Sequence, residues 1–140
     1  MKNLKNVYVV LALLAFLGLN ACSSSTDASP DLASQVAGTY NLVQMTSGGL
    51  VITPATLVAI KGTLEIKVVR TASSTGTMSV ILKSPVANSS ETAPISFTSG
   101  TGGTINVLEA GQSIGTYTAG VLRISSKDDT GAVYSLEAKK

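Results

Sequence analysis

Few side chains in this sequence could carry out chemistry, and their types exclude most classes of enzyme. The 140 residues include no His and one Cys, Cys22. A Ser-His-Asp triad, a Cys-His pair and a His-ligated metal site therefore cannot form from these residues. Catalysis by a carboxylate pair or by a Ser-Lys arrangement would still be possible in principle. No local spacing of the residues indicates either site. We expect no catalytic residue, no metal and no cofactor, and we interpret the protein as a non-enzyme.

Two short segments contain residue types that bind ions or phosphate in other proteins. Asp128-Asp129 followed by Gly131 offers carboxylate oxygens, which calcium prefers, but no third and fourth ligand follow at loop spacing. The same residues favour a hairpin turn, which is our interpretation. Residues 100–104 are rich in glycine, but they lack the Gly-Lys-Ser/Thr ending of a phosphate-binding loop and precede a predicted strand. We interpret them as a loop.

The thiol of Cys22 follows a short basic and apolar segment. Lys2 and Lys5 precede thirteen apolar or small residues, 7–19, and Leu19-Asn20-Ala21 leads into the cysteine. A helix needs about 20 apolar residues to span a bilayer, so this run is too short, and it matches the apolar region of a signal peptide. The segment resembles the signal peptide of bacterial lipoproteins, which ends in a lipobox, although Asn20 departs from the small residue usual at its position.

This resemblance implies that residues 1–21 are removed and that the sulfur of Cys22 accepts a diacylglyceryl group. The amine freed by cleavage can take a third acyl chain. One chain holds a protein at a membrane only marginally, whereas two or three make the attachment effectively permanent. Lipidation also accounts for an odd thiol in an exported protein. The alternative is an uncleaved membrane anchor that ends at a cysteine by chance.

The residue after the cysteine indicates the destination of such a lipoprotein. In many Gram-negative bacteria, lipoproteins without Asp at this position pass to the outer membrane, and here the position holds Ser23. We therefore expect a lipid anchor in the outer membrane of the cell envelope, with the periplasmic or surface face left open. Residues 23–29 are small and polar, which predicts a flexible tether.

The chain that remains after processing is balanced in charge. The sequence has 10 basic and 8 acidic residues, and Lys2 and Lys5 leave with the signal peptide, so 8 of each sign remain. Nucleic-acid binding needs clustered Lys and Arg, so we exclude it. The remaining aromatic residues are also too few for the stacking platforms of sugar or base binding. They are Tyr40, Phe97, Tyr117 and Tyr134.

Alternation of apolar and polar residues predicts a β domain after a short helix within residues 29–38, which Ser29 would cap and Gly38 would end. Residues 64–68 alternate cleanly and residues 78–82 less so, because of Ile81, and the polar segment 71–76 between them indicates a hairpin. Further strands are predicted at 40–45, 95–98, 104–108, 113–118, 120–125 and 132–138. In residues 53–62 the cap residues favour a helix, but the apolar residues fit a strand, which we prefer.

The helix followed by Gly38-Thr39-Tyr40 resembles the start of lipocalin-like domains, whose signature is Gly-x-Trp. Residues 115–124 and 132–137 are similar to the closing strands of small lipocalin-like lipoproteins. The resemblance implies an all-β antiparallel up-and-down barrel of about eight strands over residues 38–140, preceded by a lipidated tether and short helix, 22–37. It also implies an arginine packed over the ring at position 40, a role that would fall to Arg123. The alternative fold is a β-sandwich.

A barrel of this size can hold one small apolar molecule in its mouth. The candidate lining residues are the apolar face of the predicted hairpin, namely Leu64, Ile66, Val68, Met78, Val80 and Leu82. In a filled barrel the same residues would be ordinary core. We therefore expect a membrane-anchored carrier or scavenger of a small apolar ligand, with a structural module that contacts another envelope protein as the alternative. Lys139 and Lys140 are expected to form a solvated tail.

Overall fold

The structure of the protein is a computed structural model that describes residues 30–127 and 131–140. The predicted signal peptide 1–21, Cys22, the tether and the turn at Asp128-Asp129 lie outside the described residues. Within the described ranges, no helix combines the length and apolar character needed to cross a membrane.

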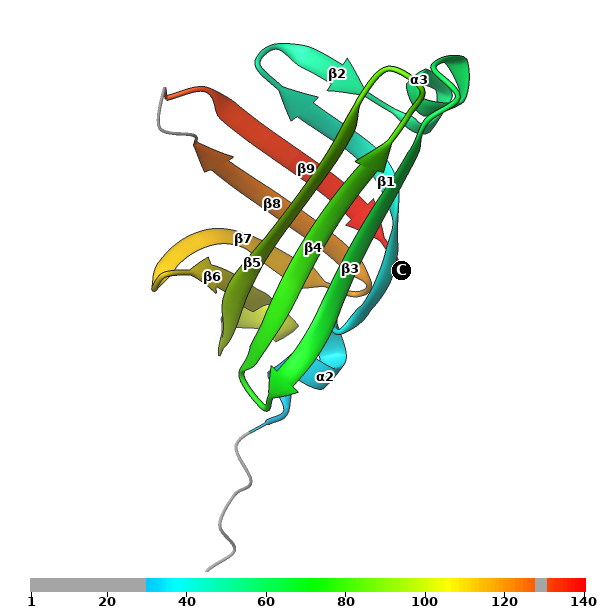
Figure 1. The fold of residues 1–140 in the computed structure, drawn as a ribbon. Coiled ribbons are helices and arrows are strands. Elements are labelled where there is room, and N and C mark those ends of the chain that lie inside the picture. Colours follow the sequence, from blue (N-terminus) through cyan, green and yellow to red (C-terminus); the bar gives the residue numbers. More distant parts are fainter. Residues whose placement is uncertain (1–29, 128–130) are drawn as a thin grey trace, which may run out of the picture.

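The strands form one antiparallel sheet that closes on itself (Figure 1). Neighbours follow the order β2-β1-β3-β4-β5-β6-β7-β8-β9, and β1 also pairs with β9, so eight strands make a barrel and β2 lies outside it. Their bounds are β1 Gly38–Ser47, β2 Leu50–Ile52, β3 Thr63–Ala72, β4 Thr75–Lys83, β5 Asn88–Ser99, β6 Ile105–Glu109, β7 Gln112–Thr118, β8 Val121–Lys127 and β9 Val133–Lys139. The predicted all-β barrel of eight strands is confirmed, and the sandwich alternative is wrong.

Side-chain alternation divides the barrel wall into an inner and an outer face. In β3, Ile66 and Val68 are buried, while Glu65 and Lys67 are exposed. Directly opposed residues of antiparallel strands point to the same face of the sheet. The register therefore determines which residues of each neighbouring strand face inward. The inner face and the first helix together supply one hydrophobic core, and no polar or charged side chain is buried in the described part of the chain.

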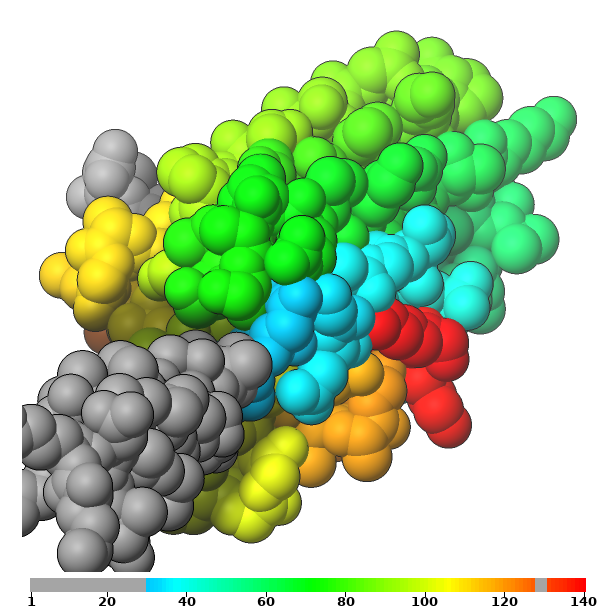
Figure 2. All heavy atoms as spheres, turned by 90° about the horizontal axis from the view of Figure 1, so that it is seen from below, coloured from blue at the N-terminus to red at the C-terminus, as the bar shows by residue number. Residues whose placement is uncertain are grey.

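One end of the barrel is covered by the predicted N-terminal helix, α2 (Leu32–Val36). Figure 2 looks onto this end and shows α2 at the centre, between β3 and the C-terminal strands. The helix contacts β3 and β5, and its buried residues are Leu32, Ala33 and Val36. Asp31 is the N-cap in place of the expected Ser29, because its carboxylate accepts a hydrogen bond from the backbone N–H of Ser34 at 2.9 Å.

An ion pair fixes α2 to the barrel wall. Nη2 of Arg70 in β3 lies 2.9 Å from a carboxylate oxygen of Asp31, and its Nε donates to the same carboxylate. The hydrogen bond from Arg70, followed by the one from the Ser34 backbone, lowers the pKa of Asp31 from 3.8 to about 2. The ionised form of Asp31 therefore holds the helix in place.

The preference for a strand in residues 53–62 is wrong, because the chain forms the helix α3 (Pro54–Ala59) there. The cap signals decide the outcome: the Thr53 side chain accepts from the Thr56 N–H, and Pro54 begins the first turn. Only Leu57 of this helix is buried, and Val58 is 77% exposed. The apolar residues that suggested a strand are thus mostly not packed. The helix lies at the end of the barrel opposite α2 (Figure 1).

Candidate functional site at the open end of the barrel

The register of the β3–β4 hairpin brings all six predicted lining residues onto the inner face. They form the opposed pairs Leu64–Leu82, Ile66–Val80 and Val68–Met78. Ile66 and Val68 are 0% and 2% exposed and belong to the packed core. The other four are only partly buried and pack against the edge of that core. The prediction of a shared face is confirmed, and the set divides into two core residues and four that keep apolar surface within reach of solvent.

The inner apolar wall continues around strands that the sequence did not single out. Met45 of β1 opposes Ile52 of β2 on one side and Leu136 of β9 on the other, and Leu136 opposes Ile124 of β8. Met45, Ile52 and Ile124 are partly buried, as Leu64 and Leu82 are. Alternation in the last two strands was visible in the sequence. The β1–β9 pairing that brings them beside β1 was not.

Exposed apolar side chains gather on the loops of the same end. They sit on the β1–β2 hairpin, on α3, in the β4–β5 turn and at the start of β9, all at the end of the barrel opposite α2 (Figure 1). We call these residues the rim; they are Leu50, Val51, Val58, Ile60, Val86 and Val133. Val86 is 86% exposed and Leu50 is 72% exposed. The end that carries the rim is called the open end below.

A gap in strand pairing lies beside the open end. β4 pairs with residues 88–96 of β5, but β6 pairs only with residues 96–99. The N–H of Phe97 donates to the Ser74 carbonyl, so the backbone groups of Phe97 point toward β4. Backbone groups of successive residues point to opposite sides of a strand. The N–H and carbonyl groups of residues 90 and 92 therefore point away from β4. Pro94 falls on the same side, where its missing N–H costs no ladder bond. In the described part of the chain no strand pairs with this edge.

At the α2 end, by contrast, contacts that the sequence did not predict join the helix to the barrel. The Lys140 ammonium lies 5.7 Å from the centroid of the Tyr40 ring and 5.5 Å from that of Tyr117, and it donates to the Gln35 carbonyl at 2.7 Å. The Tyr40 hydroxyl donates to the Val36 carbonyl. Burial, and to a lesser degree the neighbouring Tyr117, raises the pKa of Tyr40, and partial burial lowers the pKa of Lys140.

These contacts correct two expectations. Arg123 does not cover the ring of Tyr40, because it pairs with Glu137 at 3.0 Å on the outer face of β8 and β9. Lys140, expected in a solvated tail, takes that place. Its stem also packs on Gly38, where an added Cβ would lie 2.8 Å from Cε of Lys140.

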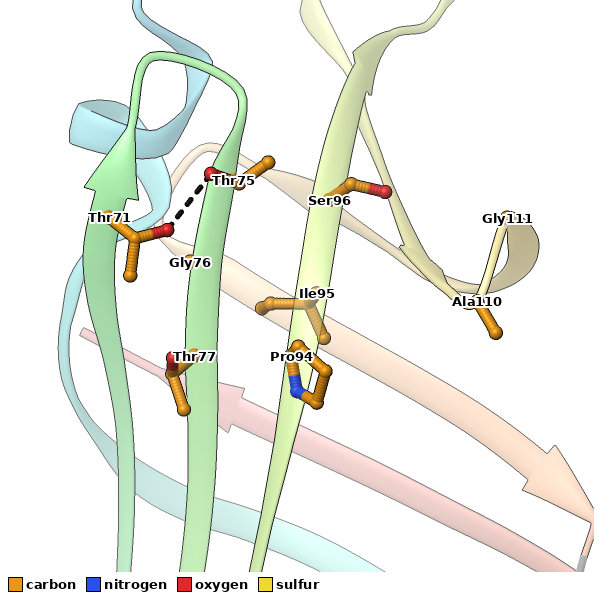
Figure 3. A pocket seen from close by; sticks show the side chains of 9 residues that line it. All are labelled: Thr71, Thr75, Gly76, Thr77, Pro94, Ile95, Ser96, Ala110 and Gly111. Atoms are coloured by element: carbon orange, nitrogen blue, oxygen red, sulfur yellow. Dashed lines mark hydrogen bonds between the residues drawn. The ribbon is translucent and has the colours of Figure 1, made fainter.

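A shallow groove of about 410 Å³ lies on the outer face, away from the predicted lining residues (Figure 3). It runs from the β3–β4 hairpin across β5 to the β6–β7 turn at Ala110-Gly111. Its walls carry hydroxyl groups and no charged side chain, and two of the hydroxyls, on Thr71 and Thr75, are hydrogen-bonded to each other at 2.9 Å. The groove therefore offers no charge for ligand recognition.

No protein-family model, curated protein or solved structure matches this chain.

Proposed function

We propose that the protein is an outer-membrane lipoprotein, attached by acyl chains on Cys22, that binds a small apolar ligand at the open end of its barrel as a carrier or scavenger. The observation that carries this proposal is the incomplete burial of the inner wall. Ile66 is fully buried, whereas Leu64 and Leu82, on the same face and nearer the open end, are not. An apolar wall that continues beyond the packed core favours an apolar occupant.

Burial of this wall would supply the binding energy. Each 100 Å² of apolar surface removed from water contributes about 2.5 kcal/mol, before the cost of immobilising the ligand is subtracted. The partly buried side chains of the wall are Met45, Ile52, Leu64, Val80, Leu82 and Ile124. They come from five strands, so a ligand among them would contact several sides of the barrel at once.

The proposed anchor directs the open end away from its own membrane. Cys22 lies eight residues before Pro30, which enters the barrel at the α2 end. If residues 23–29 form the tether that the sequence predicts, it would extend about 16 Å on average, roughly half of the ~33 Å length of a ten-residue strand such as β3. On this proposal the ligand enters from the aqueous compartment rather than from the leaflet that holds the acyl chains.

The proposal is tested with Nile red, an uncharged dye whose fluorescence increases in apolar surroundings, and a chain that begins at Ser23. Every buried residue that the structure describes lies after position 31, so this chain keeps the described core. We expect saturable binding, lost in Val80→Arg at the half-buried inner wall. Ser79→Arg, on the outer face of the same strand, is the matched control and should bind normally. Ile66→Arg is unsuitable because the residue is fully buried and a charge there would unfold the barrel.

The rim supports a second candidate function, contact with another envelope protein. Val58 and Val86 are 77% and 86% exposed, and single apolar side chains on several adjacent loops can form a protein contact. An intact fold that does not bind Nile red would overturn the carrier proposal and favour this alternative.

A further inference from the structure

We infer that the open end selects amphiphiles with a cationic head group, and that Glu91 is the residue that sets this preference. The inference rests on the proposed function, because it specifies the chemical class of the apolar ligand. It arises from a carboxylate that the register places on the inner wall, opposite Val80.

The position of Glu91 follows from the register of β4 with β5. Glu91 opposes Val80, and two residues further along Ala93 opposes Met78. Val80 and Met78 are on the inner face, and opposed residues share a face, so Glu91 also lies on the inner face. Its side chain is exposed because it belongs to the part of β5 that β6 does not cover.

Among the described residues, no cation pairs with Glu91. Lys83 opposes Asn88 and Lys127 opposes Val133, which places both lysines on the outer face. In the ranges that the structure describes, Glu91 makes no ion pair and no side-chain hydrogen bond. A ligand beside Val80 therefore meets the unpaired negative charge of Glu91 next to apolar surface.

This arrangement matches an apolar tail with one positive charge at its head. The tail would lie along Val80, Leu82 and Leu64, and an ammonium group would pair with the carboxylate of Glu91. A carboxylate head, as in a free fatty acid, would be repelled by the same group. Because Glu91 is exposed to water, each effect is modest, about three- to fivefold in affinity.

Glu91 also has a simpler interpretation, the protection of an unpaired strand edge. An inward-pointing charge and a proline both discourage the addition of another strand, and β5 has Glu91 and Pro94 near its open edge. If this were its whole role, removal of the charge would promote self-association and would leave head-group preference unchanged. The two roles are therefore separable by experiment.

The test is displacement of Nile red from the Ser23 chain by three compounds with the same ten-carbon tail: decylamine, decanol and decanoate. We expect decylamine to displace the dye at the lowest concentration and decanoate at the highest, about tenfold apart at low salt. Glu91→Gln should remove the difference and Glu91→Lys should reverse it. Glu65→Gln, an exposed outer-face change on β3, which is separated from β5 by β4, is the matched control and should keep the difference.

The outcomes separate this inference from the proposed function. Equal displacement by all three compounds, or a preference that survives in Glu91→Gln, would overturn the role of Glu91 and leave the carrier proposal intact. Failure of Nile red to bind the folded wild-type chain would overturn both. Circular dichroism of each variant verifies that the barrel is folded before its binding is interpreted.

Discussion

The ammonium group of Lys140 lies 5.7 Å from the centroid of the Tyr40 ring and donates a hydrogen bond to the Gln35 carbonyl in α2. The two residues come from opposite ends of the described chain. Their contact joins the segment after β9 to the first strand and to the helix that covers the barrel. The backbone N–H of Lys140 also donates to the Gly120 carbonyl at 3.0 Å, so the residue is held by its main chain as well.

Replacement of Lys140 should destabilise the barrel. Lys140→Met keeps most of the apolar stem but removes the cation from both rings and the donor from Gln35, and we expect a loss of about 1 kcal/mol in the free energy of unfolding. Urea denaturation followed by circular dichroism measures it. The adjacent Lys139→Met, at an exposed side chain that contacts neither ring nor Gln35, should change stability little. Equal losses of stability in the two variants would contradict a stabilising role for the Lys140 contacts.

The Asp31–Arg70 ion pair should make the stability of the barrel depend on pH in the acidic range. The folded pKa of Asp31 is about 2, below its ordinary 3.8. A carboxyl group with a lowered pKa stabilises the fold above its unfolded pKa and loses this contribution as the pH falls to the folded value. The stability of the wild type relative to Asp31→Asn should therefore be constant near neutral pH and decrease between about pH 4 and pH 2. Urea unfolding over this range measures the difference, and parallel pH profiles would disprove the effect.

Gly115 should not tolerate a side chain. A Cβ at this position would lie 2.0 Å from the carbonyl oxygen of Arg123 and 2.9 Å from the Cα of Ile124 in the paired strand β8. Gly115→Ala would force β7 and β8 apart, and we expect a loss of about 2 kcal/mol in the free energy of unfolding. Ser113→Ala, an exposed position on the same strand, is the control. An unchanged urea midpoint in Gly115→Ala would show that the strands can separate without cost.

If Cys22 is lipidated as proposed, Cys22→Ser should abolish the modification, because a serine hydroxyl does not replace the thiol that would accept the diacylglyceryl group. In bacterial cells that process lipoproteins, we expect an uncleaved precursor that no longer incorporates labelled palmitate. Ser23→Ala should still be labelled. Continued labelling of Cys22→Ser would remove the basis for the proposed anchor.

The strands of the barrel were predictable because their alternation is local. In β3, apolar residues at every second position were visible in the sequence, and the hairpin with β4 followed from the polar segment between them. β2 was missed because its three residues are too few to establish a period. α3 was misassigned because Val58 and Ile60 suggested burial, yet both remain exposed in the structure.

The candidate site was less predictable, because its properties depend on pairings between distant strands. The sequence identified Val80 and Leu82 as inward-facing but could not separate them from the buried Ile66. The inward orientation of Glu91 depends on the register of β4 with β5, where one residue of shift would have turned it outward. The contact of Lys140 with Tyr40 likewise needed the closed barrel.

Barrel closure by β1 and β9 also has a consequence for biosynthesis. The ladder joins residues 41–47 to residues 134–139, so β1 lacks its partner on that side until β9 has been synthesised. Pairing between such distant segments is slow compared with the formation of local hairpins. On the proposed route of export, the order of the strands would thus delay closure of the barrel until β9 has been synthesised.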